Sequence, residues 1–410
     1  MTTATAPGQQ SFRDVWLISL AHGLTHWYLA TFFLLLPVIG REFGLSYTQI
    51  GIIMTAQYVM GALTNLPAGM LVDTMGKKGY WMALSLFWIG FPYALISLTH
   101  SFWMVLICMT LVGMGNNFWH PAAISALAQR YPDRKGLVLS IHGMGGNVGE
   151  ALAPFVIGAM LAWFSWRTVV VLNVAPGLIM SVVILLVLGA FTMDRHEEKT
   201  KKHAGGFKSY MKGFSQLLTN KPQMLLAVSS AFRNMTQAGL RTFLPVYLAY
   251  ELGYSTFIVG VILAVLQLMG FISQPIAGHL SDKMGRKRVV ASSMALTAVM
   301  IVGIVLAGKS LIFILFVSLI GFFLFATRAV VQAWAIEAAP RNLAGSAIGL
   351  QFGVGALGSS FGPALFGIVA DHYGIYPAFY FLAGTIVFAN VLIVFMPSGA
   401  LEHREVAATT

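Results

Sequence analysis

Glu150 is an acidic residue inside a stretch of small and apolar residues that runs from Gly143 to Gly158. In a helix that begins at Gly136, its side chain would lie about 21 Å from the helix start, far from either end. Burial at that depth penalises the charged form of a carboxyl and favours the protonated form. We therefore predict that Glu150 takes up and releases a proton during function. The alternative is a structural acid that pairs with a nearby base.

Three arginines lie in apolar stretches where charge is equally costly, namely Arg233, Arg241 and Arg328. A guanidinium group stays charged and offers a planar fork of donors that fits carboxylate or phosphonate oxygens. Arg233 and Arg241 are eight residues apart, so a helix places them on one face. Each could form a salt bridge with an acid, but together they outnumber the one deep acid, Glu150. The pattern predicts a cavity that attracts an anion.

Histidines and amides in the same apolar stretches form a second set of candidates. His22 and His26 are four residues apart, which is a metal-ligand spacing, but the sequence places no acidic or cysteine ligand beside them. We therefore predict no metal site. His120 could relay a proton or bind solute, and a satisfied polar contact is the alternative. The predicted solute ligands are Arg233, Arg328, Arg241, His120, His26, Asn116 and Gln351, and the predicted proton carriers are Glu150 and His120.

The elements that must position these residues are membrane-spanning helices. The chain is 57% hydrophobic and only 10% charged, whereas soluble proteins carry about 25% charged residues. Apolar runs recur along it, each long enough to cross roughly 30 Å of hydrocarbon. We predict an all-α membrane protein with twelve spans, at 14–39, 47–73, 79–99, 102–130, 136–163, 168–192, 222–249, 255–281, 289–308, 310–337, 344–371 and 376–397.

The two halves of the chain are related by an offset of 209 residues, which links Gly69 with Gly278 and Gly76 with Gly285. A duplication in one direction predicts two pseudo-symmetric six-helix bundles with a solute site between them. The predicted domains are an N-terminal tail (1–13), a first bundle (14–192), a linker with an amphipathic helix (193–221), a second bundle (222–397) and a C-terminal tail (398–410).

The net charge of +11 is unevenly distributed over the predicted loops. If the N-terminus is cytoplasmic, only Arg41, Arg167 and Lys309 among the basic loop residues fall on the outer side. This asymmetry is the positive-inside pattern, so it places both tails and the linker in the cytoplasm and argues against nucleic acid as a partner. The predicted location is a bacterial cytoplasmic (inner) membrane.

Two matched loops carry the pattern Gly-x-x-x-Asp-x-x-Gly-basic, where glycine permits a tight turn and the basic residues hold the loop at the anionic leaflet. With these loops, the chain resembles the major facilitator superfamily from residue 14 to residue 397. The resemblance implies a two-bundle transporter that works by alternating access, in which the loops are gates rather than solute ligands. The implied gating residues are Gly69, Asp73, Gly76, Lys77, Gly278, Asp282, Gly285 and Arg286.

Small residues and prolines recur in the fifth and eleventh predicted spans, where they let helices approach closely. The predicted packing residues are Gly149, Pro154, Gly158, Gly358, Gly362 and Pro363. The first set is similar to the Gly-Pro motif of exporters in the family, with Ala153 where that motif has glycine. His22 and the segments 112–121, 145–149 and 367–372 look like the fosmidomycin-resistance branch of exporters. That likeness implies proton-driven export of small anionic or phosphonate-type compounds, and with it drug resistance.

We therefore predict a proton-coupled secondary active transporter of a small, anionic organic solute, with efflux favoured and proton-coupled import as the alternative. An intramembrane enzyme is less favoured because no catalytic constellation is apparent, and a passive channel does not explain the paired gating loops. We predict no cofactor and a functional monomer, with the solute, protons and the lipid bilayer as partners.

Overall fold

The computed structural model describes residues 12–189, 215–340 and 343–396, without the side chains of Leu66, Asp73, Ala344 and Gly345. Within these ranges there is no β-strand, and twelve helices of 19 to 30 residues make up the fold. The predicted linker helix falls largely on residues outside this description. The helices are α1 (Arg13–Glu42), α2 (Tyr47–Met75), α3 (Lys78–Ile96), α4 (Phe102–Arg130), α5 (Lys135–Leu161), α6 (Trp166–Leu188), α8 (Lys221–Tyr250), α9 (Thr256–Met284), α10 (Arg286–Ala307), α11 (Leu311–Glu337), α12 (Ala344–Tyr373) and α13 (Ile375–Val394).

Ten of the described helices are long and apolar enough to cross a membrane. The other two long helices are α2 and α8, and α8 contains both Arg233 and Arg241. The predicted all-α membrane fold with twelve helices is therefore confirmed.

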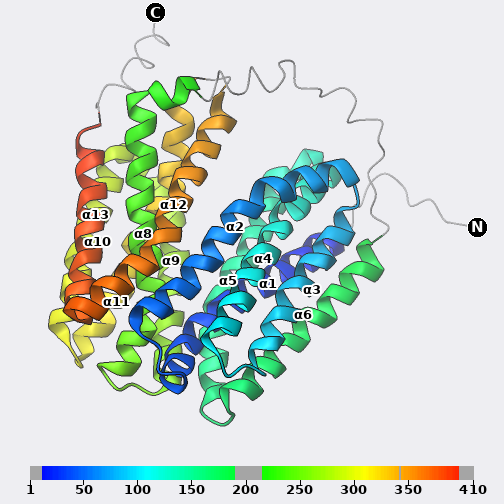
Figure 1. Ribbon diagram of the computed structural model, residues 1–410. Coiled ribbons are helices and arrows are strands. Elements are labelled where there is room, and N and C mark those ends of the chain that lie inside the picture. Colours follow the sequence, from blue (N-terminus) through cyan, green and yellow to red (C-terminus); the bar gives the residue numbers. More distant parts are fainter. Residues whose placement is uncertain (1–11, 190–214, 341–342, 397–410) are drawn as a thin grey trace, which may run out of the picture.

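The helices form two bundles that repeat one pattern of packing (Figure 1). In the first bundle α1 packs on α5, α2 on α4 and α3 on α6. In the second bundle the corresponding pairs are α8 with α12, α9 with α11 and α10 with α13. The bundles meet where α2 packs on α12 and where α5 packs on α9. These two contacts are equivalent, because the duplication relates α2 to α9 and α5 to α12. The duplication read from the sequence is thus a duplication of tertiary contacts.

Repeated residues begin the equivalent helices α2 and α9 in the same way. The side chain of Ser46 accepts a hydrogen bond from the backbone N–H of Gln49, and that of Ser255 accepts one from Ile258. Such caps satisfy backbone donors that a helix start leaves free. Gly44 and Gly253, which precede them, both have φ of +60°, a conformation that favours glycine. The two equivalent turns therefore have the same helix cap and the same glycine conformation.

The bundles touch at one end, which we call the contact end and define by residues 37–51, 154–158, 249–260 and 363–371. A Cβ added to Gly51 would lie 2.3 Å from the carbonyl oxygen of Pro363, and one on Gly260 would lie 2.2 Å from that of Pro154. At the opposite end, the linker end, a Cβ on Gly69 or Gly278 would meet nothing within 4 Å. Figure 1 shows the bundles together at the contact end and diverging toward the opposite end, where α6 ends and α8 begins.

Candidate solute and proton site

Two pockets lie between the bundles, with empty volumes of about 790 and 1010 Å³. We call them the arginine pocket and the histidine pocket. Arg328, Gln332 and Phe352 line both, so the two pockets adjoin, and we call them together the cavity. The arginine pocket is built mainly by α8, α11 and α12, and the histidine pocket adds α1, α4 and α5. The cavity therefore draws its walls from both halves of the protein.

Glu150 on α5 is paired across the bundle interface with Arg241 on α8. Each of its carboxylate oxygens accepts a hydrogen bond of 3.2 Å from the guanidinium of Arg241. The amide of Gln267 on α9 donates to the same carboxylate at 3.0 Å, and Nδ1 of His26 on α1 lies 3.2 Å from it. The side chains of Glu150 and Arg241 are each 16% exposed, so this is a largely desolvated pair.

This pairing revises the role of Arg241. Sequence spacing grouped it with Arg233 as a solute ligand on one helix face, and both do line the arginine pocket. The guanidinium of Arg241, however, uses two N–H groups on Glu150 and lies 4.8 Å from the ring centre of Phe325. Arg241 is thus the partner of the deep acid, because the packing of α5 against α9 at the bundle interface brings the opposite charges together.

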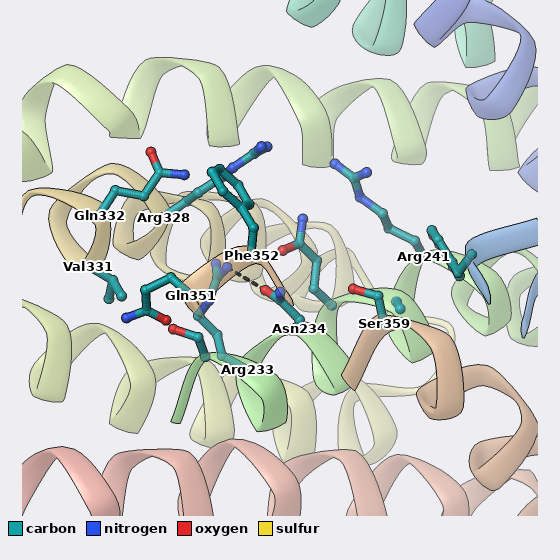
Figure 2. Close-up of a pocket in the computed structure, with 13 residues that line it drawn as sticks. Arg233, Asn234, Arg241, Arg328, Val331, Gln332, Gln351, Phe352 and Ser359 are labelled. Carbon is teal, nitrogen blue, oxygen red and sulfur yellow. Dashed lines mark hydrogen bonds between the residues drawn. The ribbon is translucent and has the colours of Figure 1, made fainter. Parts of the chain in front are cut away.

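Arg233 and Arg328 have no acidic partner among the described residues (Figure 2). Arg233 is 5% exposed, donates to the side chains of Asn234 and Thr327, and leaves its Nε without a hydrogen-bond partner in the described structure. Arg328 is exposed into the cavity and makes no hydrogen bond to any described residue. Two guanidinium charges therefore face the cavity without a neutralising carboxylate.

Amide groups beside these arginines also lack partners. Both amide atoms of Gln351 are buried without a hydrogen bond to any described residue, and the residue is only 6% exposed. Buried polar groups cost free energy unless water, protein or ligand satisfies them. Because Gln351 lines the arginine pocket, a polar solute could satisfy it. The pocket thus combines positive charge with unused amide groups.

Four histidines from the first bundle cluster in the histidine pocket. Nδ1 of His22 lies 2.7 Å from the backbone oxygen of His142, and Nε2 of His22 lies 3.3 Å from Nε2 of His120. The rings of His22 and His142 stack with centres 3.9 Å apart, and the ring of His26 stands edge-on to that of His22. His26 and His120, predicted from sequence as solute ligands, therefore lie together and line the cavity.

Asn116 does not line either pocket, although it was predicted as a solute ligand. Its side-chain oxygen is buried and has no partner among the described residues. It lies one helical turn before His120 on the same face of α4, but it is not among the residues that line either pocket. We therefore remove Asn116 from the candidate ligands.

Sequence reasoning missed polar residues that the structure places in the cavity. Gln267 bonds Glu150, and further polar side chains line the pockets: Tyr58, Asn147, Asn234, Gln237, Gln274, Gln332 and Ser359. Amides inside apolar spans are a usable signal, since such residues usually face a bundle interior. The sequence cannot say which of several interior faces each one joins.

The predicted gating loops lie at the linker end. Arg286 forms ion pairs with Asp282 at 2.5 Å and with Glu337 on α11 at 2.9 Å. Gly76 and Gly285 end α2 and α9 with φ of +65° and +90°. The side chain of Asp73 lies outside the description. The described pairs of Arg286 stay within the second bundle, so this loop does not fasten the two bundles together here.

An unpredicted contact joins the bundles at the contact end. The carboxylate of Asp371 on α12 accepts hydrogen bonds from the backbone N–H of Tyr47 at 2.9 Å and of Thr48 at 2.8 Å. These two amides belong to the first turn of α2, where free donors and the helix dipole favour a negative charge. Asp371 thus holds the start of α2 from the opposite bundle.

Comparisons with known proteins agree with this architecture. The profile of the Major Facilitator Superfamily matches residues 15–363 and, in a second match, 226–409. A phosphoglycerate transporter protein of Salmonella typhimurium is 25% identical, over 94% of this chain and 89% of its own. A fosmidomycin resistance protein of Escherichia coli is also 25% identical, over 98% and 96%. The crystal structure of a bacterial homologue of the human lysosomal transporter Spinster, inward-facing and occupied, superposes with a TM-score of 0.80 at 16% identity, covering 94% of this chain and 97% of that one.

Proposed function

The chain belongs to the major facilitator superfamily, and on this premise we propose that it is a proton-coupled secondary active transporter of a small organic anion. The observation that carries the proposal is the charge arrangement in the cavity. Arg233 and Arg328 face it without acidic partners, while the one deep acid, Glu150, is held against Arg241 and His26. The cavity therefore has both a place for an anion and a group that can take up a proton.

The proposed solute carries a carboxylate, phosphate or phosphonate group. Guanidinium forks bind such oxygens in a bidentate manner, and Gln351 adds a hydrogen-bonding group to the same pocket. The relatives support this chemistry, because phosphoglycerate is an acid and another relative is a hexuronate transporter of Bacillus subtilis. We propose Arg233, Arg328 and Gln351 as solute ligands, with His26 and His120 on the opposite wall.

Proton coupling follows from competition for Arg241. While Glu150 is ionised, it neutralises Arg241 across the bundle interface. A proton on Glu150 cancels that attraction and frees the guanidinium to add its charge to the pocket. Proton binding and anion binding then influence each other through Arg241, which is the reciprocity that coupled transport requires.

Efflux and import are supported by different observations. We propose efflux first, on the similarity to a fosmidomycin resistance protein. Import by proton symport is the second candidate, and one observation favours it. Because a proton on Glu150 would free Arg241 for an anion, the proton and the anion would bind together rather than in competition.

We propose that the linker end faces the cytoplasm of a bacterial inner membrane, since the basic loop residues gather there. The cavity then opens inward in this structure, and the contact end is the closed outer gate. In this proposal the matched glycine–aspartate loops at the linker end control the inner gate, and the protein functions as a monomer. Asp371 on α12 then stabilises the closed outer gate through its hydrogen bonds to the first turn of α2.

Replacement of Asp371 with Asn should shift the protein toward the outward-open state by about tenfold, because an amide keeps one acceptor and loses the charge that α2 favours. Spin labels at positions 74 and 283, in a background without Cys108, would report the distance between the bundles at the linker end. The variant should populate shorter distances there than the parent. A matched change of an exposed acid outside both gates, Asp133→Asn, should leave the distances as they are in the parent. Identical distance distributions for Asp371→Asn and its parent would show that Asp371 does not hold this gate.

Reconstitution into liposomes tests the function itself. Phosphoglycerate, a hexuronate and fosmidomycin serve as labelled probes, with a pH gradient imposed and the membrane potential clamped. We expect at least one probe to accumulate unchanged against its gradient, and to stop when a protonophore collapses the pH difference. Accumulation inside an acidic lumen indicates antiport, and accumulation from an acidic exterior indicates symport. Equilibration without accumulation would point to a channel, and chemical conversion of the probe to an enzyme; either would overturn the proposal.

A further inference from the structure

Three histidines of the first bundle lie close together in the histidine pocket, and two of them, His26 and His120, are also proposed solute ligands. One ring nitrogen from each of His22, His26 and His120 lies within 4.8 Å of the others. His22 and His26 come from α1 and His120 comes from α4. Sequence spacing offered only two of these ligands, and helix packing supplies the third.

The surroundings of two of these rings determine where their protons lie. A carbonyl oxygen only accepts hydrogen bonds, so Nδ1 of His22 must donate to the backbone oxygen of His142 at 2.7 Å. Nδ1 of His26 faces the carboxylate of Glu150 at 3.2 Å and donates likewise. In the neutral rings, Nε2 of His22 and Nε2 of His26 then each carry a lone pair that can bind a metal ion. Metal-binding histidines are typically held in this manner, by a carbonyl or carboxylate on the other nitrogen.

The distance between one pair of ring nitrogens already fits a shared cation, and the third nitrogen lies within 4.8 Å of both. Nε2 of His22 lies 3.3 Å from Nε2 of His120. A tetrahedral zinc ion with Zn–N bonds of about 2.0–2.1 Å would place its ligand nitrogens about 3.3–3.4 Å apart. The competing explanation is a single N–H···N hydrogen bond between the two rings, which has a similar length.

The backbone makes room for this group, and one acid offsets its charge. A Cβ at Gly146 on α5 would lie 2.8 Å from the ring of His22 and 3.1 Å from that of His26, so a larger residue would displace both rings. The carboxylate of Glu150 supplies negative charge beside His26. All three ligands belong to the first bundle, so movement of one bundle against the other leaves their geometry intact.

We propose that His22, His26 and His120 bind a divalent transition-metal ion of the zinc type. Three protein ligands leave one position of a tetrahedral ion open, as in sites where the ion also meets a small molecule. The three histidines line the histidine pocket together with Arg328, so the open position can face the cavity where the anion is proposed to bind. The metal site itself does not depend on the identity of the solute or on its transport.

The test is direct metal binding to the full-length protein, purified in detergent through a tag without histidine. Isothermal titration with Zn²⁺ should give one site per chain. Co²⁺, used as a spectroscopic probe, should show the visible absorption of tetrahedral coordination. His120→Ala, His22→Ala and His26→Ala should each weaken Zn²⁺ binding by at least about a hundredfold, and Glu150→Gln, which removes only an outer partner, by about 10–100-fold.

Two histidines outside the cluster provide matched controls, His100 in the loop before α4 and His279 on α9. His100→Ala and His279→Ala should keep parental Zn²⁺ affinity. Thermal unfolding with and without Zn²⁺ separates folding from binding, because a folded variant that lost a ligand should unfold normally and lose only its Zn²⁺-dependent stabilisation. Absence of saturable Zn²⁺ binding in the parent, or parental Zn²⁺ affinity in all three cluster variants, would overturn the proposal in favour of a His22–His120 hydrogen bond.

Discussion

The Glu150→Gln variant should lose pH-driven accumulation of solute down to the level of empty liposomes. Glutamine matches the size of the protonated acid and can still accept from Arg241 and donate toward the cavity, so the fold is preserved. It cannot release a proton, and it no longer neutralises the guanidinium 3.2 Å away. Solute-for-solute exchange should persist because it moves no net proton. Both activities are measured with the same labelled anion in the same liposomes.

Equilibrium binding gives a second readout of the same change. In the parent, acidification should raise affinity for an anion, because a proton on Glu150 releases Arg241 toward the pocket. In Glu150→Gln the affinity should be high and nearly independent of pH. Asp133→Asn, in the exposed turn between α4 and α5, is the matched control and should behave as the parent. If the Glu150→Gln protein still concentrates solute on a pH gradient alone, Glu150 is structural, and His120 or His26 becomes the next candidate.

Arg328→Ala and Arg233→Ala should each weaken binding of an anionic solute by roughly thirtyfold. The estimate assumes loss of one charge-assisted contact of about 2 kcal/mol. Neither guanidinium has an acidic partner in the described structure, so neither substitution strands a buried carboxylate. Lysine at either position should restore only part of the affinity, because it keeps the charge and lacks the planar fork. Binding to the purified protein is the measurement.

Two comparisons make this result specific to charge. Arg288→Ala, exposed near the start of α10, should keep parental affinity. A neutral analogue of the solute should bind the parent weakly and lose little more in the arginine variants. Parental affinity for the anion in both Arg233→Ala and Arg328→Ala would remove the basis for an anion site. Arg241→Ala should differ from both variants by lowering the stability of the protein, because it leaves the largely buried carboxylate of Glu150 without its cationic partner.

The sequence was sufficient for the fold because the signals that specify it are local or repeated. Apolar runs long enough to span a bilayer identify the helices, and the offset between Gly69 and Gly278 identifies the duplication. Each helix satisfies its own backbone hydrogen bonds, so its existence depends little on its neighbours. The equivalent packing of α1 on α5 and of α8 on α12 then follows from the repeated sequence.

The candidate site depended on tertiary structure, because sequence shows which residues are polar within a span but not how each helix is rotated and packed. Glu150 and Arg241 were both predicted as functional, yet only the packing of α5 against the second bundle shows that they form a pair. The same packing brings His120 to His22 across two helices, whereas Asn116 is not among the residues that line the cavity. It also places Asp371 against the first turn of α2, far away in the chain. Local sequence thus determined the helices and their order, whereas interhelical packing decided which charges are neutralised and which remain free to bind.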